Sequence, residues 1–306
     1  MPYNNLISRS DADVFIPQEV SAEVIRLATD QSAALTLCRT VPMSAKLKKM
    51  PVLSALSVAY FVNGDTGLKQ TTEEAWTGLT LEAEEIAAIV PAPEAVIEDA
   101  DVDVWAQLRP GLAEAVGAAL DAAVFAGTNK PTTWPTAIVP AAVAAGNVAT
   151  TGNTPETGGV VGDLDETFDL VEADGFDVNG IAARRKLRSL LRKARDSGGQ
   201  PLVDASTEQI LGADIAYVTE GTFVDPTLAV VGDYEMAVVG VRQDLTYKLL
   251  DQAVITDDTG NIIYNLPQQD MLALRVVARF GFAVAKPVSR NASGAGGFPF
   301  AVLNSA

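Results

Sequence analysis

The side chains that most often perform enzymatic chemistry are scarce in this sequence. Its 306 residues include no histidine and a single cysteine, Cys38. The lack of histidine removes Ser-His-Asp and Cys-His catalysis, imidazole metal sites and the commonest general base. Cys38 lies among apolar residues of an amphipathic segment, so we expect a small core residue rather than a nucleophile. The acidic residues are scattered over predicted loops, which disfavours a carboxylate-dependent enzyme. We predict no catalytic residue.

Two short segments could in principle bind a ligand. The segment from Gly64 to Lys69 has the glycines and the lysine of a phosphate-binding loop, but its spacing is wrong and no serine or threonine follows the lysine. Asp257, Asp258 and Asn261 carry the oxygen ligands that calcium prefers. Their spacing is not that of a calcium loop, and a hairpin turn is the better interpretation. We therefore predict no cofactor and no metal.

One segment is strongly basic. Seven of the twelve residues from 184 to 195 are lysine or arginine, which suggests nucleic-acid binding. The alternative is a helix with a core stripe of Leu187, Leu190 and Leu191 and a solvated cationic face. The whole chain has a formal net charge of −17, whereas tight binding of phosphates needs a surplus of Lys and Arg. We favour the solvated face.

Length and composition also bound the class of protein. A chain of 306 residues can bury a substantial core in one large or two ordinary domains. No apolar run approaches the roughly 18 residues of a membrane span, and the first residues lack the basic-then-apolar pattern of a signal peptide. We expect a soluble protein made in a cytoplasm, without membrane contact.

A long amphipathic helix is predicted from residue 99 to residue 127. Aspartates at positions 99, 101 and 103 can accept hydrogen bonds from the free N–H groups at its start, and Gly127 tolerates the left-handed conformation that ends a helix. Apolar residues recur at every fourth position and form one stripe: Val104, Leu108, Leu112, Val116, Leu120 and Val124. Trp105, Ala115, Ala119 and Ala123 accompany this stripe. Such a helix is roughly 40 Å long, and we expect Pro110 to kink it.

Two strands are predicted before this helix. The side chains of residues 55 to 62 and of residues 76 to 82 have the two-residue periodicity of β-strands. Residues 86 to 97 are predicted to form a further extended segment. Asn63-Gly64 provides the turn of a hairpin whose polar tip runs from residue 63 to residue 74. A hairpin of this length is not stable alone, because neither face is covered from within. It must lie on another part of its own chain or on a neighbouring copy.

The remaining segments are assigned from their periodicity. Residues 1 to 17 indicate an extended arm, residues 18 to 39 one helix or two short ones, and residues 131 to 159 a loop with short strands. A compact α/β unit follows, with helices from residue 163 and over 184 to 196, and strands over 176 to 182 and 215 to 218. Further strands are expected over 237 to 242, 247 to 255, 262 to 265 and 271 to 285, before a loosely held tail from residue 289.

The order of these parts resembles the major capsid proteins of tailed phages with the Hong Kong 97 fold. An N-terminal arm, an extended two-stranded loop, a spine helix, an axial α/β domain and peripheral strands follow each other in the same order. The local strings that resemble the family are Val41-Pro42-Met43, Met50-Pro51-Val52, Asp121 to Gly127, Arg195 to Leu202, Gly212 to Ile215 and Gly232-Asp233-Tyr234.

The resemblance implies an α+β fold in six parts. They are an N-terminal arm and helix (1–40), an extended loop (41–98), a peripheral domain with the spine helix (99–159), an axial domain (160–231), the returning peripheral strands (232–288) and a C-terminal tail (289–306). It also implies seven residues of the loop as contacts with a neighbouring subunit: Asn63, Gly64, Asp65, Lys69, Glu73, Glu74 and Trp76.

The implied function is structural rather than enzymatic. Members of the family self-assemble through hexamers and pentamers into the icosahedral shell around the genome of a tailed double-stranded DNA bacteriophage. The implied partners are scaffolding, portal and cement or decoration proteins, with packaged DNA held only loosely. The implied location is the virion capsid, after assembly in the host cytoplasm. No coiled scaffolding region precedes residue 1, which implies a separate scaffolding protein or none.

Two points within the fold stay open. The family's Lys–Asn cross-link has no clear match, although Lys69 lies at a suitable loop tip. An encapsulin-like cellular shell is the alternative in the same fold. That group usually begins with a helix, which disfavours it for a chain that begins with a proline-flanked arm.

The charge balance makes a first testable prediction. Isolated subunits should bind duplex DNA only weakly at physiological ionic strength, because a chain with a formal net charge of −17 releases few counterions from phosphates. Fluorescence anisotropy of labelled duplex DNA at two salt concentrations measures this. Nanomolar binding with a steep salt dependence would contradict it.

Overall fold

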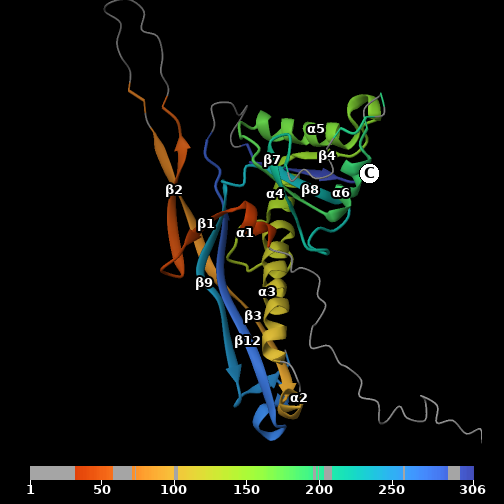
Figure 1. The fold of residues 1–306 in the computed structure, drawn as a ribbon. Coiled ribbons are helices and arrows are strands. Elements are labelled where there is room, and N and C mark those ends of the chain that lie inside the picture. Colours follow the sequence, from red (N-terminus) through yellow and green to blue (C-terminus); the bar gives the residue numbers. More distant parts are fainter. Residues whose placement is uncertain are drawn as a thin grey trace, which may run out of the picture.

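The computed structural model describes residues 32–57, 71–72, 74–99, 103–195, 198, 200–202, 209–257, 259–288 and 297–306. These residues form two large β-sheets (Figure 1). The first is long and narrow and has the helix α3 along one face, and the second lies beyond one end of that helix (Figure 1). A separate two-stranded sheet lies at the opposite end of the long sheet (Figure 1).

The long sheet has five strands in the order β1-β9-β12-β3-β2. Their bounds are β1 Arg39–Pro42, β2 Leu47–Ala55, β3 Ala75–Pro93, β9 Ala237–Leu250 and β12 Met271–Val284. β1 runs parallel to β9, and the other neighbours are antiparallel. β3 changes its partner along its length, since Leu47 of β2 lies opposite Glu82 and Gly281 of β12 lies opposite Ala83. The first part of β3 and β2 therefore form a two-stranded ribbon that projects from the sheet (Figure 1).

The helix on this sheet is α3 (Val104–Asp121). Asp103 is its N-cap, and the Asp103 side chain accepts a hydrogen bond of 3.0 Å from the N–H of Ala106. After Asp121 the helix continues as the π-helical turn η2 (Ala122–Ala126) and ends at Gly127, which has φ of 79°. The short helix α2 (Glu94–Glu98) directly follows β3.

The second sheet has six strands in the order β4-β13-β8-β5-β7-β6. Their bounds are β4 Val148–Thr150, β5 Gly180–Ala183, β6 Gln209–Ile210, β7 Ala213–Tyr217, β8 Thr227–Gly232 and β13 Phe300–Asn304. Helices α5 (Gly159–Ala173) and α6 (Arg185–Lys193) cover one face through a core that includes Leu164, Phe168, Leu187 and Leu191. Helices α1 (Ala33–Leu37) and α4 (Ile138–Ala145) cover the other face. β5 and β8 are buried at every position, as expected for strands enclosed on both faces.

The separate hairpin consists of β10 (Val254–Thr256) and β11 (Ile262–Asn265). Two short 3₁₀ turns complete the described elements, η3 (Pro155–Thr157) and η4 (Leu266–Gln268).

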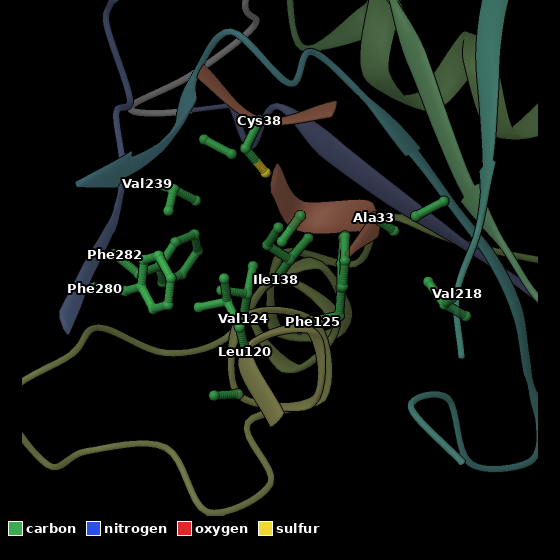
Figure 2. Close-up of a cluster of buried hydrophobic side chains, with 14 of the residues drawn as sticks. Ala33, Cys38, Leu120, Val124, Phe125, Ile138, Val218, Val239, Phe280 and Phe282 are labelled. Carbon is green, nitrogen blue, oxygen red and sulfur yellow. The ribbon is translucent and has the colours of Figure 1, made fainter. Parts of the chain in front are cut away.

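The largest hydrophobic cluster lies where the two sheets meet. It joins the end of α3, η2, α1, α4 and both sheets. Figure 2 shows Leu120, Val124 and Phe125 packed near Ala33 and Ile138. Cys38 belongs to this cluster with 5% of its surface exposed, and burial raises the pKa of its thiol. The interpretation of Cys38 as a core residue is confirmed.

The apolar stripe of α3 is buried at one end only. Leu112, Val116, Leu120 and Val124 are buried, whereas Val104 and Leu108 are half-buried. Of the accompanying residues, Ala123 is buried, Trp105 is half-buried, and Ala115 and Ala119 are exposed. α3 runs without interruption through Pro110, and the expected kink stays a prediction.

Several predicted boundaries before and within the helix were wrong. α3 begins at Val104 rather than at Asp99, because the side chain of Asp103 caps it and Asp99 lies at the end of α2. Position 101 lies outside the described residues. α2 replaces the end of the extended segment predicted over 86 to 97, since it starts directly after Pro93. α1 ends at Leu37, and Arg39 belongs to β1 rather than to a helix.

The strands of the ribbon also differ from the prediction. β2 covers Leu47–Ala55 and so begins before the strand predicted over 55 to 62, because it follows the pairing with β3; residues 58–70 lie outside the described part. β3 is one strand of 19 residues rather than two segments. It stays continuous because β12 replaces β2 as its partner after Glu82.

Several strands of the second sheet and one of the helices that cover it were missed. Residues 131 to 159 contain α4, whose alanines favour a helix and which ends at Gly146 with φ of 88°. β8 gave no alternating signal because all of its residues are buried. In addition, β5 begins at Gly180 rather than at Phe176. The two strands predicted over 237 to 242 and 247 to 255 correspond to the single strand β9 and the start of β10.

The prediction of a loosely held C-terminal tail is wrong for its last residues. β13 pairs with β8 on one side and with β4 on the other. Phe300, Ala301, Val302 and Leu303 are each 0% exposed. The segment before residue 298 is rich in glycine and serine, and the whole tail was predicted to be loosely held because of that composition, despite this apolar run. The six-stranded sheet therefore extends beyond residues 160–231. It includes β4 and β13, and β8 ends one residue later, at Gly232.

The burial gradient along α3 generates a paired test. Val116→Asp places an uncompensated carboxylate where 4% of the side chain is exposed, and we expect a loss of several kcal/mol, enough to prevent stable folding. Leu112→Asp should behave in the same way. The matched control, Ala115→Asp, alters an exposed position of the same helix and should cost no more than about 1 kcal/mol. Thermal melting by circular dichroism measures all three, and equal melting of Val116→Asp and Ala115→Asp would contradict the assignment.

Candidate functional site

The described residues contain no group of three or more His, Cys, Asp or Glu side chains placed to hold a metal ion. No helix in the same part of the chain is long and apolar enough to span a membrane. The Gly64–Lys69 segment and Asp258 lie outside the described residues. The features that remain for a functional site are surfaces.

The proposed calcium ligands form a hairpin turn between β10 and β11, as the preferred interpretation predicted. The Asp257 carboxylate accepts hydrogen bonds from the Thr259 hydroxyl at 2.7 Å and from the N–H of Asn261 at 2.8 Å. These bonds, that of Thr259 first, hold the pKa of Asp257 at about 2, below its ordinary value. The carboxylate therefore closes the turn within its own chain.

The ribbon formed by β2 and the first part of β3 is the most exposed part of the long sheet. No residue of β2 is buried, and neither is any residue of β3 before Leu81. Trp76, one of the predicted contact residues, is 64% exposed. Glu74 is exposed and accepts a hydrogen bond from the hydroxyl of Ser57. The other five predicted contact residues, Asn63, Gly64, Asp65, Lys69 and Glu73, lie outside the described residues.

Ion pairs tie the base of the ribbon to the sheet. The Lys46 ammonium lies 3.1 Å from a carboxylate oxygen of Glu82 and 3.6 Å from one of Glu84. The Glu82 hydrogen bond and the two negative charges raise the pKa of Lys46. Glu84 also accepts a hydrogen bond of 3.1 Å from the hydroxyl of Thr133. Further along the ribbon, the carbonyl of Leu53 accepts a hydrogen bond of 3.2 Å from the N–H of Val288, and Met50 and Leu79 pack against a small cluster that includes Met43.

A second exposed surface lies at the opposite end of the long sheet and was missed by the sequence analysis. Its elements carry seven large apolar side chains that are between 37% and 63% exposed: Ile89, Leu249, Val254, Val96, Ile262, Ile263 and Tyr264. They come from α2, the ends of β3 and β9, and the β10–β11 hairpin, which lie together in Figure 1. The signal in the sequence was Ile262-Ile263-Tyr264, which shows no alternation of apolar and polar residues. We call this surface the apolar tip.

The basic segment forms α6 as the solvated-face interpretation predicted. Leu187 and Leu191 are buried and Leu190 is half-buried, while the lysines and arginines from position 185 onward are exposed. Arg184 precedes the helix and forms ion pairs with Glu220 at 3.3 Å and with Asp225. Hydrogen bonding to Asp225 raises the pKa of Arg184.

The N-terminal end of the described chain is held by one buried carboxylate. Asp121 is 0% exposed and accepts hydrogen bonds from the Ser32 hydroxyl at 2.6 Å, the N–H of Ala33 at 2.9 Å and the N–H of Ala34 at 3.0 Å. Burial raises the pKa of Asp121, and the three hydrogen bonds oppose that rise. The carboxylate thus joins the start of α1 to the end of α3.

An exposed projecting ribbon and an apolar tip are typical of a structural protein that packs against copies of itself. The comparisons with known proteins agree with this class. The family model of the phage capsid family matches residues 12–289. The chain belongs to the phage capsid family.

Solved structures of phage proteins match almost the entire chain. A structure from Microbacterium phage Oxtober96 is 37% identical, with a TM-score of 0.84, and covers 98% of this chain and 99% of that chain. Structures from Mycobacterium phage Cain and Mycobacterium phage Adephagia are each 31% identical, with TM-scores of 0.85 and 98% coverage of both chains. A search of curated proteins gave no match.

These matches confirm the resemblance to tailed-phage major capsid proteins with a Hong Kong 97-like fold. The chain has a mixed α+β fold that matches phage capsid structures, and it is a structural protein of a capsid shell. The family consists of structural proteins, which agrees with the prediction of a non-enzymatic role.

The Asp121 contact generates a prediction with a pH dependence. Ser32→Ala removes one donor from a buried carboxylate, and the unfolding free energy of the unassembled subunit should fall by about 1.5–3 kcal/mol at pH 7. The Ser32 hydrogen bond opposes the raised pKa of Asp121, so its loss raises the folded-state pKa further. A carboxyl whose pKa is higher in the folded than in the unfolded chain loses stability as the pH rises through the folded-state pKa. The deficit should therefore be larger at pH 7 than at pH 4, as measured by urea denaturation.

Thr36→Ala is the matched control on the same helix. Its hydroxyl donates to the neutral carbonyl of Ser32 at 2.9 Å, so its loss should cost the same at both pH values. If Ser32→Ala lowers the unfolding free energy by the same amount at pH 4 and at pH 7, the acceptor at position 121 is not a charged carboxylate.

Proposed function

We propose that the chain self-assembles through hexamers and pentamers into the icosahedral shell that encloses the double-stranded DNA genome of a tailed bacteriophage. The single observation that carries this proposal is the β2–β3 ribbon, which projects from the sheet and has no buried residue in β2 or in β3 before Leu81 (Figure 1). Membership in the phage capsid family supports it.

The physical argument concerns the two faces of the ribbon. A two-stranded hairpin is marginally stable in water unless a third strand, a helix or another surface covers it. The described ribbon is held by the ion pairs of Lys46 and by a hydrogen bond from the N–H of Val288 to the carbonyl of Leu53, but none of its residues before Leu81 is buried. Exposed Trp76 gives the ribbon an aromatic side chain of the kind that is enriched in protein interfaces. A neighbouring subunit supplies the missing layer, and the loop tip from residue 63 to residue 74 contacts that neighbour.

The two sheets correspond in this proposal to the parts expected from the sequence. The five-stranded sheet with α3 is the peripheral domain with its spine helix, and the six-stranded sheet is the axial domain. The axial sheet takes in β4 and β13, so the proposed boundaries differ from residues 160–231. The apolar tip is a second contact surface, because exposed apolar patches of this kind mark interaction sites.

The partners follow from this role. Other copies of the chain are the main partners, in hexamers and pentamers. Scaffolding, portal and cement or decoration proteins are further partners, and the acidic chain holds packaged DNA only by loose contact. The shell is assembled in the host cytoplasm and the chain ends up in the virion.

A deletion in the loop tests the proposal. Removing residues 64 to 72 and closing the turn with Asn-Gly should leave the subunit folded, since the described core does not depend on them. Assembly should fail, because the ribbon no longer reaches a neighbour. Size-exclusion chromatography with light scattering and circular dichroism should give native-like dichroism without closed particles.

The control replaces residues 64 to 72 with a Gly-Ser linker of equal length. It keeps the reach of the loop but removes its side chains, so a defect shared by both variants assigns the contact to the side chains. If the deletion variant forms closed particles of normal size, the proposed contact between the loop and a neighbouring subunit is wrong. If the deletion variant does not fold, the loop belongs to the core of the subunit.

A further inference from the structure

We infer that the six-stranded domain carries both halves of a charged head-to-tail contact between neighbouring copies of this chain. The cationic face of α6 in one copy binds the acidic groove between α5 and β4 in the next copy. This inference rests on the proposed function, because it names the surfaces that join subunits within one ring.

The cationic half lies on the β7 side of α6. Arg188, Arg192 and Lys193 are exposed, and the Arg188 guanidinium lies 5.8 Å from the centre of the Tyr217 ring on β7. The charges of Arg188 and Arg192 both act on the Tyr217 hydroxyl, where they oppose the rise in pKa that burial causes. Among the described residues, no carboxylate forms an ion pair with these three cations. They are available to a partner.

The acidic half is a groove between α5 and β4. Asp165, Asp169 and Glu172 line it together with the backbone strand Val148–Thr150, and all three carboxylate side chains are exposed. Glu166 also lines the groove and accepts a hydrogen bond of 3.0 Å from the side-chain amide of Asn153. Within the part of the chain that the structure describes, Asp165, Asp169 and Glu172 have no cationic partner.

The strand order separates the two halves. β4 forms one edge of the sheet, and β7 is the fourth strand beyond it. At roughly 4.8 Å per strand β4 and β7 are about 19 Å apart, too far for the groove to pair with the β7 side of α6 in the same chain. Each copy therefore presents an acidic edge and a basic edge that are complementary to each other. A contact between two different patches repeats head to tail, and it gives a ring when the rotation closes.

The charge of the whole chain explains why the contact is needed. Copies with a formal net charge of −17 repel each other at long range. A cluster of cations on one short helix gives an approaching copy one orientation in which opposite charges meet. Exposed ion pairs contribute little affinity each, so the contact sets orientation and association rate more than strength. High salt should therefore slow ring formation.

Charge reversal with rescue tests the inference. Arg188→Glu/Arg192→Glu places carboxylates opposite the acidic groove, and Asp165→Lys/Asp169→Lys places ammonium groups opposite the cationic face of α6. Each variant should fold like the wild type and lose about tenfold or more in particle yield, because like charges now face each other. One chain with all four substitutions has opposite charges again at these positions and keeps the original net charge, and it should recover assembly. If the Glu variant does not fold, Arg188→Gln/Arg192→Gln removes the charges without reversal and should also lower the yield.

Mixing the two double variants gives a sharper test by electron microscopy. The acidic and the basic variant can alternate around a ring of six without any like-charged contact, but a ring of five always contains at least one. The mixture should form six-membered rings and few closed shells. Two results would overturn the inference. The chain with four substitutions could assemble as poorly as either double variant, or the double variants could assemble like the wild type. Wild-type chain that forms neither rings nor shells would instead overturn the proposed function.

Discussion

The carboxylate of Asp121 holds the start of the described chain against the end of the long helix. A charge with no exposed surface is costly to bury, and here three donors at the beginning of α1 offset that cost. The partners lie between 87 and 89 residues away in the sequence, so the contact fixes a long-range arrangement rather than a local turn. With α1 in place, β1 begins two residues after α1 ends and runs parallel to β9.

The junction of the two sheets depends on this arrangement and on Tyr234. The Tyr234 hydroxyl donates to the carbonyl of Val230 at 3.0 Å and accepts from the N–H of Ala182 at 3.1 Å. Its ring packs edge-on against Phe125 of η2 and Phe300 of β13. A side chain at Gly180 would meet the ring at 2.7 Å, so a glycine is needed there. One tyrosine thus links the helix, the six-stranded sheet and the start of β9.

The sequence predicted those elements whose residues alternate between a core and solvent. The stripe of α3 is the clearest example, since Leu112 and Val116 are buried whereas Ala115 between them is exposed. β8 and β13 are buried on both faces, so they show no alternation and were missed or assigned to a tail. The ribbon was recognised as a hairpin, but the place where β3 exchanges β2 for β12 depends on tertiary pairing. The apolar tip was missed because exposure cannot be read from residue type alone.

The burial of the α3 stripe explains how stability and assembly are divided in this capsid protein. At Leu120 and Val124 both sheets supply neighbours, and these side chains are 0% exposed. At Val104 and Leu108 the side chains stay half-buried, and Leu108 is packed against the margin of the same cluster. Packing partners become scarcer with distance from the junction, until the apolar tip leaves Ile262 63% exposed. A subunit of this kind folds around its junction and keeps its uncovered apolar and charged surfaces at the periphery, where contacts with neighbouring subunits can form after folding is complete.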